Sequence, residues 1–270
     1  MLKKTLLCGL LLSSVATGAF AQDAAAPAAP AAEAAPPASP LTGNMGFFSQ
    51  YVFRGLTQTN AKPALQGGFD YAHPSGLYVG TWASNISWLS DSSSYSSGGS
   101  LEWDLYGGYR GNIGSSELTY DAGLLQYYYP GSVATGGVKA DTLEGYGALG
   151  WKFITAKYSY SMQNNTFGVT NSRGTSYFDL SANVPLGESG FTANLHYGKQ
   201  TYSGKTGTTS NSNLYSYSDY KIGLTYALPK DFSVGAFYTG TTGAKTAGYT
   251  TPYPSNIAKG TGTVFVSKTF

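Results

Sequence analysis

Histidine is the side chain most able to act as a base near neutral pH, and this chain has only two, His73 and His196. Acyl transfer needs a nucleophile beside such a base. Thr192 and Asn194 share the face of the strand predicted around His196, but serine, threonine and asparagine are so common here that this proximity carries little weight. His73 precedes Pro74 in a predicted turn, where no pocket is expected. We therefore expect no catalytic residue; a lipid-active enzyme using His196 is the alternative.

Metal ligands are equally scarce. The single cysteine, Cys8, falls in a leader that we expect to be removed, and no histidine–carboxylate spacing typical of a metal site occurs. Glu102 and Asp104 lie two residues apart, so they share one face of a strand. They could hold a cation weakly or be two hydrated carboxylates. We expect no metal site and no cofactor.

The N-terminus has the order of a cleaved export signal. Two lysines precede an apolar run from Thr5 to Val15, and Ala19-Phe20-Ala21 offers a small-residue cleavage site. The run is too short for the roughly 20 residues of a membrane-spanning helix. Residues 1–21 are therefore predicted to be a signal peptide, and residues 22–41, rich in Ala and Pro, a disordered periplasmic spacer.

The composition of the remaining chain differs from that of a soluble domain. The sequence has 23 tyrosines and 36 glycines but only 11% charged residues, whereas about 25% is usual in soluble domains. Without the two leader lysines, 14 basic residues balance 14 acidic ones, so we expect no nucleic-acid partner. This composition is typical of a barrel that meets lipid outside and water inside; a soluble β-sandwich is the alternative.

Strand-length segments with alternating apolar and polar residues follow one another from residue 42. In the segment from Phe153 to Gln163, for example, Ala156 and Tyr158 fall on one face and Lys157 on the other. Twelve strands are predicted, at residues 44–57, 62–72, 76–87, 99–110, 116–128, 141–151, 153–163, 175–185, 190–202, 216–228, 231–241 and 259–270.

The connections between these strands alternate in character. Tight turns alternate with loops that are long and rich in Ser, Thr, Gly and Asn, except the first, at residues 58–61. Short periplasmic turns and longer extracellular loops are typical of an outer-membrane barrel. We predict an all-β protein, a transmembrane antiparallel up-and-down β-barrel of about 12 strands over residues 42–270, located in the bacterial outer membrane.

The alternation also predicts which way each face points. The apolar face meets lipid, and aromatic girdles are expected from Tyr51, Tyr71, Trp103, Tyr109, Trp151, Tyr158, Tyr197, Tyr226 and Tyr238. The polar face is predicted to line the lumen with Arg54, Asp70, Glu102, Asp104, Asp121, Glu144, Lys157, Asp179, His196, Asp219 and Lys221. The excess of acidic residues favours a narrow, water-filled lumen with a mild cation preference. A salt-bridged plug that conducts nothing is the alternative.

The chain ends inside the last predicted strand, at Phe270. A final strand with a terminal aromatic residue resembles the signal that the outer-membrane assembly machinery recognises, although Lys268 replaces the aromatic residue often found two places earlier. The expected partners are this machinery, outer-membrane lipid and lipopolysaccharide, and small solutes.

Several segments resemble TorF-family porins, a proteobacterial family of outer-membrane barrels. They are Ser49-Gln50-Tyr51-Val52-Phe53-Arg54-Gly55, Pro63 to Tyr71, Ser75 to Asn85, Asp121-Ala122-Gly123 and Tyr127 to Gly131. The resemblance covers mainly the first half of the barrel and implies a poorly defined transport role without catalytic residues. Arg54 and Asp70 would then lie on neighbouring strands and pair across the first hairpin.

The function expected from these observations is passive diffusion of small hydrophilic solutes through a narrow polar lumen. The alternative is a non-conducting structural or surface-interaction barrel that acts through its extracellular loops.

Overall fold

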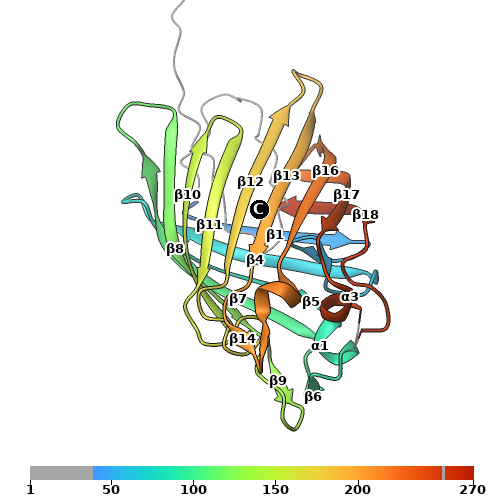
Figure 1. Ribbon diagram of the computed structural model, residues 1–270. Helices are drawn as coiled ribbons and strands as arrows, with labels where there is room; N and C mark the ends of the chain where they lie inside the picture. The colour runs from blue at the N-terminus through green and yellow to red at the C-terminus, as the bar shows by residue number, and fades with distance from the viewer. Residues whose placement is uncertain (1–38, 251–252) are drawn as a thin grey trace, which may run out of the picture.

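A computed structural model describes residues 39–250 and 253–270, and within them twelve strands form one closed antiparallel barrel (Figure 1). The strands are β1 (Leu41–Phe48), β4 (Ala64–Ala72), β5 (Leu77–Asn85), β7 (Leu101–Asn112), β8 (Leu118–Tyr128), β10 (Thr142–Trp151), β11 (Ile154–Ser161), β12 (Ser176–Pro185), β13 (Phe191–Thr201), β16 (Tyr217–Leu228), β17 (Phe232–Thr242) and β18 (Thr261–Thr269). β1 closes the ring by pairing with β18, with Phe47 opposite Val266. The predicted twelve-stranded barrel is confirmed, and a sandwich is excluded because the ring has no free edge.

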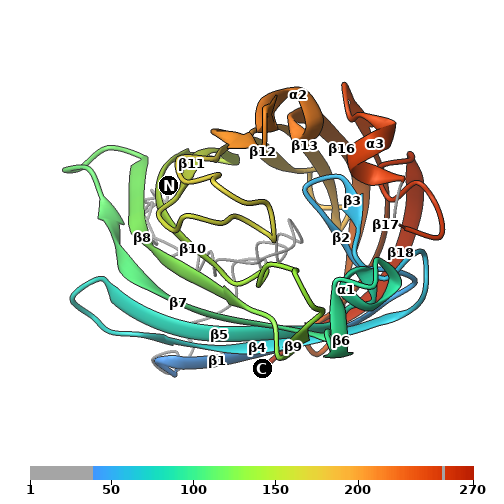
Figure 2. The ribbon, with the colours of Figure 1, turned by 60° about the horizontal axis from the view of Figure 1, so that its bottom comes forward.

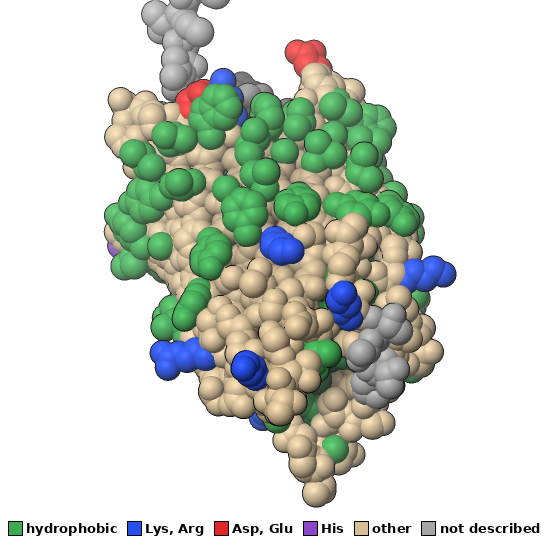
Figure 3. All heavy atoms as spheres, viewed as in Figure 1, with side chains coloured by type: hydrophobic (Ala, Val, Ile, Leu, Met, Phe, Trp, Pro, Cys, Tyr) green, Lys and Arg blue, Asp and Glu red, His purple; other side chains and the backbone are tan. Residues whose placement is uncertain are grey.

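The outer surface carries an apolar belt. Large hydrophobic side chains that a water-soluble protein would bury are exposed there, for example Ile222 (59%) and Val264 (60%). Such a continuous belt fits hydrocarbon rather than water, and it covers much of the barrel wall in Figure 3. Eight of the nine predicted girdle aromatics are exposed. Tyr51 is the exception: it is fully buried, so its assignment to a girdle was wrong.

The two ends of the barrel differ. Tight turns join the strands at the turn end, and six loops emerge at the opposite, loop end (Figure 1). The loops are L1 (49–63), L2 (86–100), L3 (129–141), L4 (162–175), L5 (202–216) and L6 (243–260). They contain the hairpin β2 (Val52–Phe53) and β3 (Leu56–Thr57) in L1, α1 (Trp88–Asp91) and β6 (Tyr95–Gly98) in L2, β9 (Gly131–Val133) in L3, β14 (Lys205–Thr206), β15 (Thr209–Ser210) and α2 (Asn211–Tyr215) in L5, and α3 (Thr246–Tyr249) in L6. None of these helices, within the described part of the chain, is long and apolar enough to cross a membrane.

The predicted first strand needs a correction. The strand expected at residues 44–57 ends at Phe48, and the chain then turns into the barrel as L1. The short loop expected at residues 58–61 is only the last part of L1. At the other terminus, Phe270 follows β18 and exchanges two backbone hydrogen bonds with Gly43, of 2.6 and 2.9 Å. Its role as an assembly signal stays a prediction, and the predicted signal peptide lies outside the described residues.

Some of the many glycines and tyrosines pack together on the inner wall. A Cβ atom added to Gly123 would lie 2.5 Å from the carbonyl oxygen of Gly107 and 2.6 Å from the hydroxyl of Tyr146. The hydroxyl of Tyr78 lies equally close, at 2.6 Å, to the Cβ position of Gly108. Inward-facing glycines therefore leave the room in which tyrosine rings lie flat against a neighbouring strand.

We expect Gly123→Ala to destabilise the barrel by about 1–3 kcal/mol, because the added methyl group overpacks the wall. The measurement is the urea unfolding midpoint in detergent micelles. Gly147→Ala is the matched control, because nothing lies within 4 Å of its Cβ position on the same β10–β8 strand pair. Equal midpoints for the two variants would contradict this account of the packing.

Candidate functional site

L1 folds into the lumen as a small hairpin, which Figure 2 shows inside the ring of strands. Its tip is the pair Arg54-Gly55, with φ angles of 47° and 78°. Two consecutive positive φ angles are typical of a type I′ hairpin turn. Gly55 is required by space as well, because a Cβ there would lie 2.5 Å from the Cβ of Asp219. The tip of L1 therefore touches the inner face of β16.

Arg54 holds this tip in place. Its guanidinium makes a two-pronged ion pair with Glu144 on β10, with Nη1–Oε1 and Nη2–Oε2 distances of 3.0 and 2.7 Å. It also donates to Oε1 of Gln200 on β13 at 3.0 Å and lies 4.2 Å from the ring centre of Tyr177 on β12. Tyr217 on β16, the strand next to β13, donates to the Arg54 carbonyl oxygen at 2.8 Å. Arg54 thus ties together strands that lie apart around the ring.

The predicted pairing of Arg54 with Asp70 is wrong. Arg54 lies beyond the end of β1, so it is not on a strand next to β4. Asp70 instead accepts a hydrogen bond from Tyr106 at 2.7 Å. The reason is that the chain leaves the wall after Phe48 and carries Arg54 across the lumen to Glu144.

One side of the lumen is filled by apolar side chains. Aromatic residues of L1, L2 and L3 pack against the inner faces of β4, β5, β7, β8 and β10 in a single cluster that includes Tyr51, Phe53, Trp82, Leu89 and Tyr129. We call this side the filled half. Apolar side chains therefore fill this side of the lumen at the level of the cluster.

Two carboxylates lie inside the filled half. Glu102 is fully buried and accepts hydrogen bonds from the hydroxyls of Tyr51 and Tyr129, at 2.6 and 2.9 Å. Burial, followed by the charge of Glu102, raises the pKa of both tyrosines well above the usual range, so both stay donors. Asp104 is equally buried and accepts no side-chain hydrogen bond from any described residue. The pair is therefore not the hydrated pair of carboxylates that one interpretation of the sequence expected.

The hydrogen bonds to Glu102 hold L1 and L3 against β7. Tyr51→Phe removes the bond from L1 and should weaken this contact. Loss of a hydrogen bond to a buried charged group costs about 1.5–3 kcal/mol. We expect faster amide hydrogen exchange across residues 49–63. Tyr71→Phe, on the lipid-facing surface, should leave exchange unchanged; if the Tyr51 variant also exchanged at the wild-type rate, L1 would be held by other contacts.

The opposite side of the lumen is polar. A cavity of about 70 Å³ lies between the tip of L1 and the inner faces of β11, β12, β13, β16 and β17, and Leu125 and Tyr127 of β8 close it on the side of the filled half. Its charged lining consists of Arg54, Lys157, Asp179, His196, Asp219 and Lys221. We call this side the open half. The cavity has room for several water molecules, since one water needs about 10–15 Å³ by this measure.

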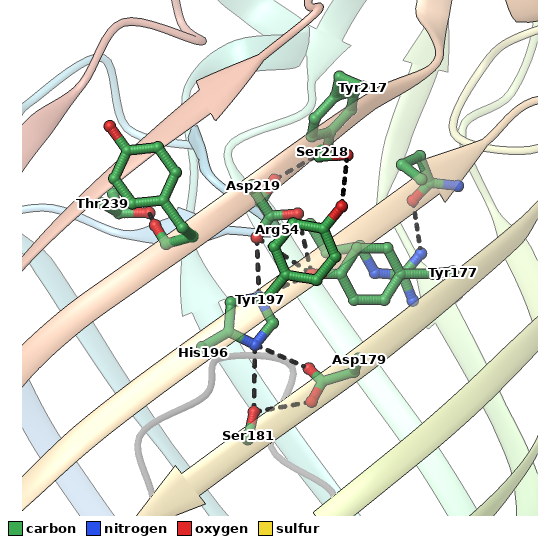
Figure 4. Close-up of polar contacts among 12 residues, drawn as sticks. Arg54, Tyr177, Asp179, Ser181, His196, Tyr197, Tyr217, Ser218, Asp219 and Thr239 are labelled. Atoms are coloured by element: carbon green, nitrogen blue, oxygen red, sulfur yellow. Dashed lines mark hydrogen bonds and ion pairs between the residues drawn. The ribbon is translucent and has the colours of Figure 1, made fainter.

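His196 organises the wall of the open half, as Figure 4 shows. Its Nε2 lies 2.8 Å from Oδ1 of Asp219 and 3.0 Å from the Tyr177 hydroxyl. Its Nδ1 lies 3.1 Å from the Ser181 hydroxyl and 3.2 Å from Oδ2 of Asp179. A histidine between two carboxylates can carry a positive charge or pass a proton between them.

Ser181, His196 and Asp219 are connected in the order of a nucleophile, a base and an orienting acid. Two observations favour a structural role. The Ser181 hydroxyl also donates to Asp179 at 2.7 Å, and His196 is 7% exposed on the inner wall, away from membrane lipid. The other histidine, His73, lies exposed in a turn with its Nδ1 2.8 Å from the Ser75 hydroxyl.

The predicted lumen residues divide between the two halves. Glu102, Asp104 and Glu144 are buried. Asp70 and Asp121 are bound to Tyr106 and Tyr78 on the inner wall of the filled half. Lys157, Asp179, His196, Asp219, Lys221 and the tip residue Arg54 border the cavity. The residues that border it are thus more basic than the predicted set as a whole.

Sequence reasoning missed the contacts that hold L1 in place. They are made by Tyr51 of L1 itself and by Gln200 and Tyr217 of the wall. Gln200 and Tyr217 alternate correctly as strand residues, and Tyr51 continues the alternation of β1 beyond its end, so no pattern marks their partners. Within residues 39–250 and 253–270, no group of three or more His, Cys, Asp or Glu side chains could hold a metal ion.

A closed twelve-stranded barrel with an apolar belt and a charged lumen defines the class of porin-like membrane β-barrels. The family model described as "Bacterial protein of unknown function (Gcw_chp)" matches residues 31–270, and the chain belongs to this family. The resemblance to TorF-family porins is not confirmed by this match.

The chain is similar in fold to solved porins. The NanC porin aligns with a TM-score of 0.51 at 11% identity, over 85% of this chain and 98% of that one. The KdgM porin gives 0.49 at 7% identity, over 85% and 99%, and OprD from Pseudomonas aeruginosa gives 0.40 at 13%, over 85% and 66%. A search of curated protein sequences gives no match.

Proposed function

We propose that this protein is a narrow outer-membrane diffusion channel whose passage runs along the open half, past the tip of L1. The observation that carries the proposal is the polar cavity between Arg54 and the His196 wall. Apolar packing fills the other side of the lumen, so solutes would pass on the polar side.

The chemistry of the lining supports hydrophilic solutes. Lys157 lies opposite Asp179 on the neighbouring strand, and Lys221 lies two residues from Asp219 on β16. Charged groups of both signs can replace part of the hydration shell of an ion or a polar solute. The small cavity and the guanidinium at its edge favour solutes no larger than an amino acid or a monosaccharide.

Liposome swelling tests this proposal. Liposomes that contain the refolded barrel should swell in glycine, in salt and, more slowly, in a monosaccharide, and should not swell in a trisaccharide. Liposomes with protein inactivated by boiling in detergent are the control. Swelling at the control rate in every solute would defeat the proposal.

A non-conducting barrel that acts through its loops is the second candidate. The observation that favours it is the filling of one side of the lumen by L1, L2 and L3. This candidate predicts no swelling with the wild-type protein and none after L1 is released. An Arg54 variant that releases L1 therefore distinguishes the two candidates. Swelling would indicate a channel that L1 blocks, and no swelling would indicate a barrel without a passage.

A further inference from the structure

The charges on the outside of the barrel are unevenly distributed. Seven exposed basic residues occupy the loop end within the described residues: Lys62, Lys139, Arg173, Lys199, Lys205, Lys245 and Lys259. We call them the basic rim. The loops contain only two described acidic residues, Asp91 and Asp141, and both are partly buried. On the face in Figure 3, acidic side chains appear only at the turn end.

Each of the two partly buried carboxylates already has a partner. Asp91 accepts a hydrogen bond from Ser87 at 2.6 Å. Asp141 accepts one from the backbone N–H of Tyr129 at 2.9 Å and pairs with Lys139 at 3.4 Å. The loop end therefore presents a net positive surface to whatever surrounds it.

Two members of the basic rim face lipid rather than the mouth of the lumen. Lys199 is exposed on the outer face of β13, two residues beyond Tyr197, and its cross-strand neighbour Phe178 is exposed beside it. Two residues along a strand rise about 7 Å. The ammonium of Lys139 lies 5.0 Å from the ring centre of Tyr128, an exposed residue at the end of β8. Both cations therefore lie at the edge of the apolar belt, where lipid head groups begin.

We propose that the edge of the belt between Lys139, in L3 next to β8, and Lys199, on β13 four strands further round the ring, is a lipid-facing binding site for the phosphate groups of lipopolysaccharide in the outer leaflet, with one lysine at each end. The loop end of a barrel faces outward, and the lipid A part of lipopolysaccharide places phosphates just above its acyl chains. An exposed ammonium beside an aromatic ring at the edge of the belt matches that height and charge. The site requires the orientation of the barrel but not the conduction of solutes.

The turn end supplies a matched control. Lys152 lies 4.9 Å from the ring centre of Trp151 and 3.6 Å from a carboxylate oxygen of Glu117, which reproduces the Tyr128–Lys139–Asp141 arrangement. Lys268 lies 4.5 Å from the ring centre of Phe232. Substitution of these two lysines removes the same charge from the opposite edge of the belt.

Native mass spectrometry of the refolded barrel in detergent tests the proposal with bisphosphorylated lipid A. The double variant Lys139→Gln/Lys199→Gln should bind it about tenfold or more weakly than wild type, since each surface cation contributes substantially to anionic lipid binding. The double variant Lys152→Gln/Lys268→Gln should bind like wild type. Lipid A without phosphates should bind all three proteins weakly and equally.

Three results would overturn the proposal. The first is wild-type affinity in the rim variant, and the second is an equal loss in both double variants. The third is binding of phosphatidylglycerol to the wild type as tight as that of lipid A, which would show a general attraction to anionic lipid. Because all four lysines are exposed or lie on the outer surface, folding of the variants should be unaffected, and heat-modifiable migration on gels verifies it.

Discussion

Arg54→Ala is expected to raise single-channel conductance at least about twofold and to make the current noisier, because the narrowest obstacle in a pore limits its current. The substitution removes the guanidinium that borders the cavity and the contacts that hold the tip of L1 to β10 and β13. It also leaves Glu144 as an unpaired carboxylate that is 2% exposed. Breaking a buried ion pair by removing one partner costs about 3–5 kcal/mol.

Planar-bilayer recording and the urea unfolding midpoint check both parts of this prediction. Lys62→Ala, an exposed site in the same loop, is the control and should change neither. The double variant Arg54→Met/Glu144→Gln should recover most of the lost stability, because neither partner of the ion pair remains as an unpaired buried charge, while L1 remains weakly held. If Arg54→Ala retained wild-type current and wild-type stability, Arg54 would not be the residue that holds L1 in the lumen.

Removal of the two cavity lysines is expected to raise the permeability ratio of cations to anions by about tenfold. At about 8 Å and an effective dielectric constant of about 20, a unit charge contributes about 2 kcal/mol to the energy of a passing ion. Lys157 and Lys221 both line the cavity, so the double variant Lys157→Gln/Lys221→Gln leaves its carboxylates in the majority. The reversal potential in a salt gradient measures the change.

The lysines outside the lumen provide the control for this selectivity experiment. Lys152→Gln/Lys268→Gln removes the same net charge at the turn end and should leave the reversal potential unchanged. An unchanged potential in the cavity variant as well would mean that permeating ions avoid the open half. The mild cation preference predicted from the seven acidic residues depends on the same point, since two of those seven, Asp179 and Asp219, line the cavity.

The wall of the barrel could be predicted from the sequence because each wall residue contacts lipid on one side and the lumen on the other. The segment at residues 153–163 became β11 (Ile154–Ser161), and that at 175–185 became β12 (Ser176–Pro185). In both, the period-two pattern follows directly from the difference between the two environments. Apart from L1, which begins at residue 49 where the sequence predicted 58, the boundaries of the loops shifted by only a few residues.

L1 could not be predicted by the same reasoning. Tyr51 and Phe53 continue the alternation of β1, but their apolar partners lie inside the barrel and not in lipid. A periodic pattern reports that a side chain is buried in something apolar, and it cannot tell aromatic packing from acyl chains. The local signal was Arg54-Gly55, a two-residue turn between Val52-Phe53 and Leu56-Thr57. It is weak because arginine rarely adopts a positive φ.

The candidate site shows the same limit. The sequence placed the strand residues His196 and Asp219 on the inner face, where the structure also has them. Their contact at 2.8 Å depends on the register of β13 with β16, which alternation alone does not fix. The division of the lumen into a filled and an open half depends on loops that meet from distant parts of the chain, such as L1 with L3 at Glu102.

The most direct measurement is the block of single-channel current by a charged methanethiosulfonate at two introduced cysteines. Ser159→Cys lines the cavity of the open half, whereas Ser84→Cys faces inward on β5, in the filled half. The account predicts that the reagent reduces the current through Ser159→Cys and leaves Ser84→Cys and wild type unaffected. Block at Ser84→Cys with none at Ser159→Cys, or no current from any of the three folded proteins, would contradict it.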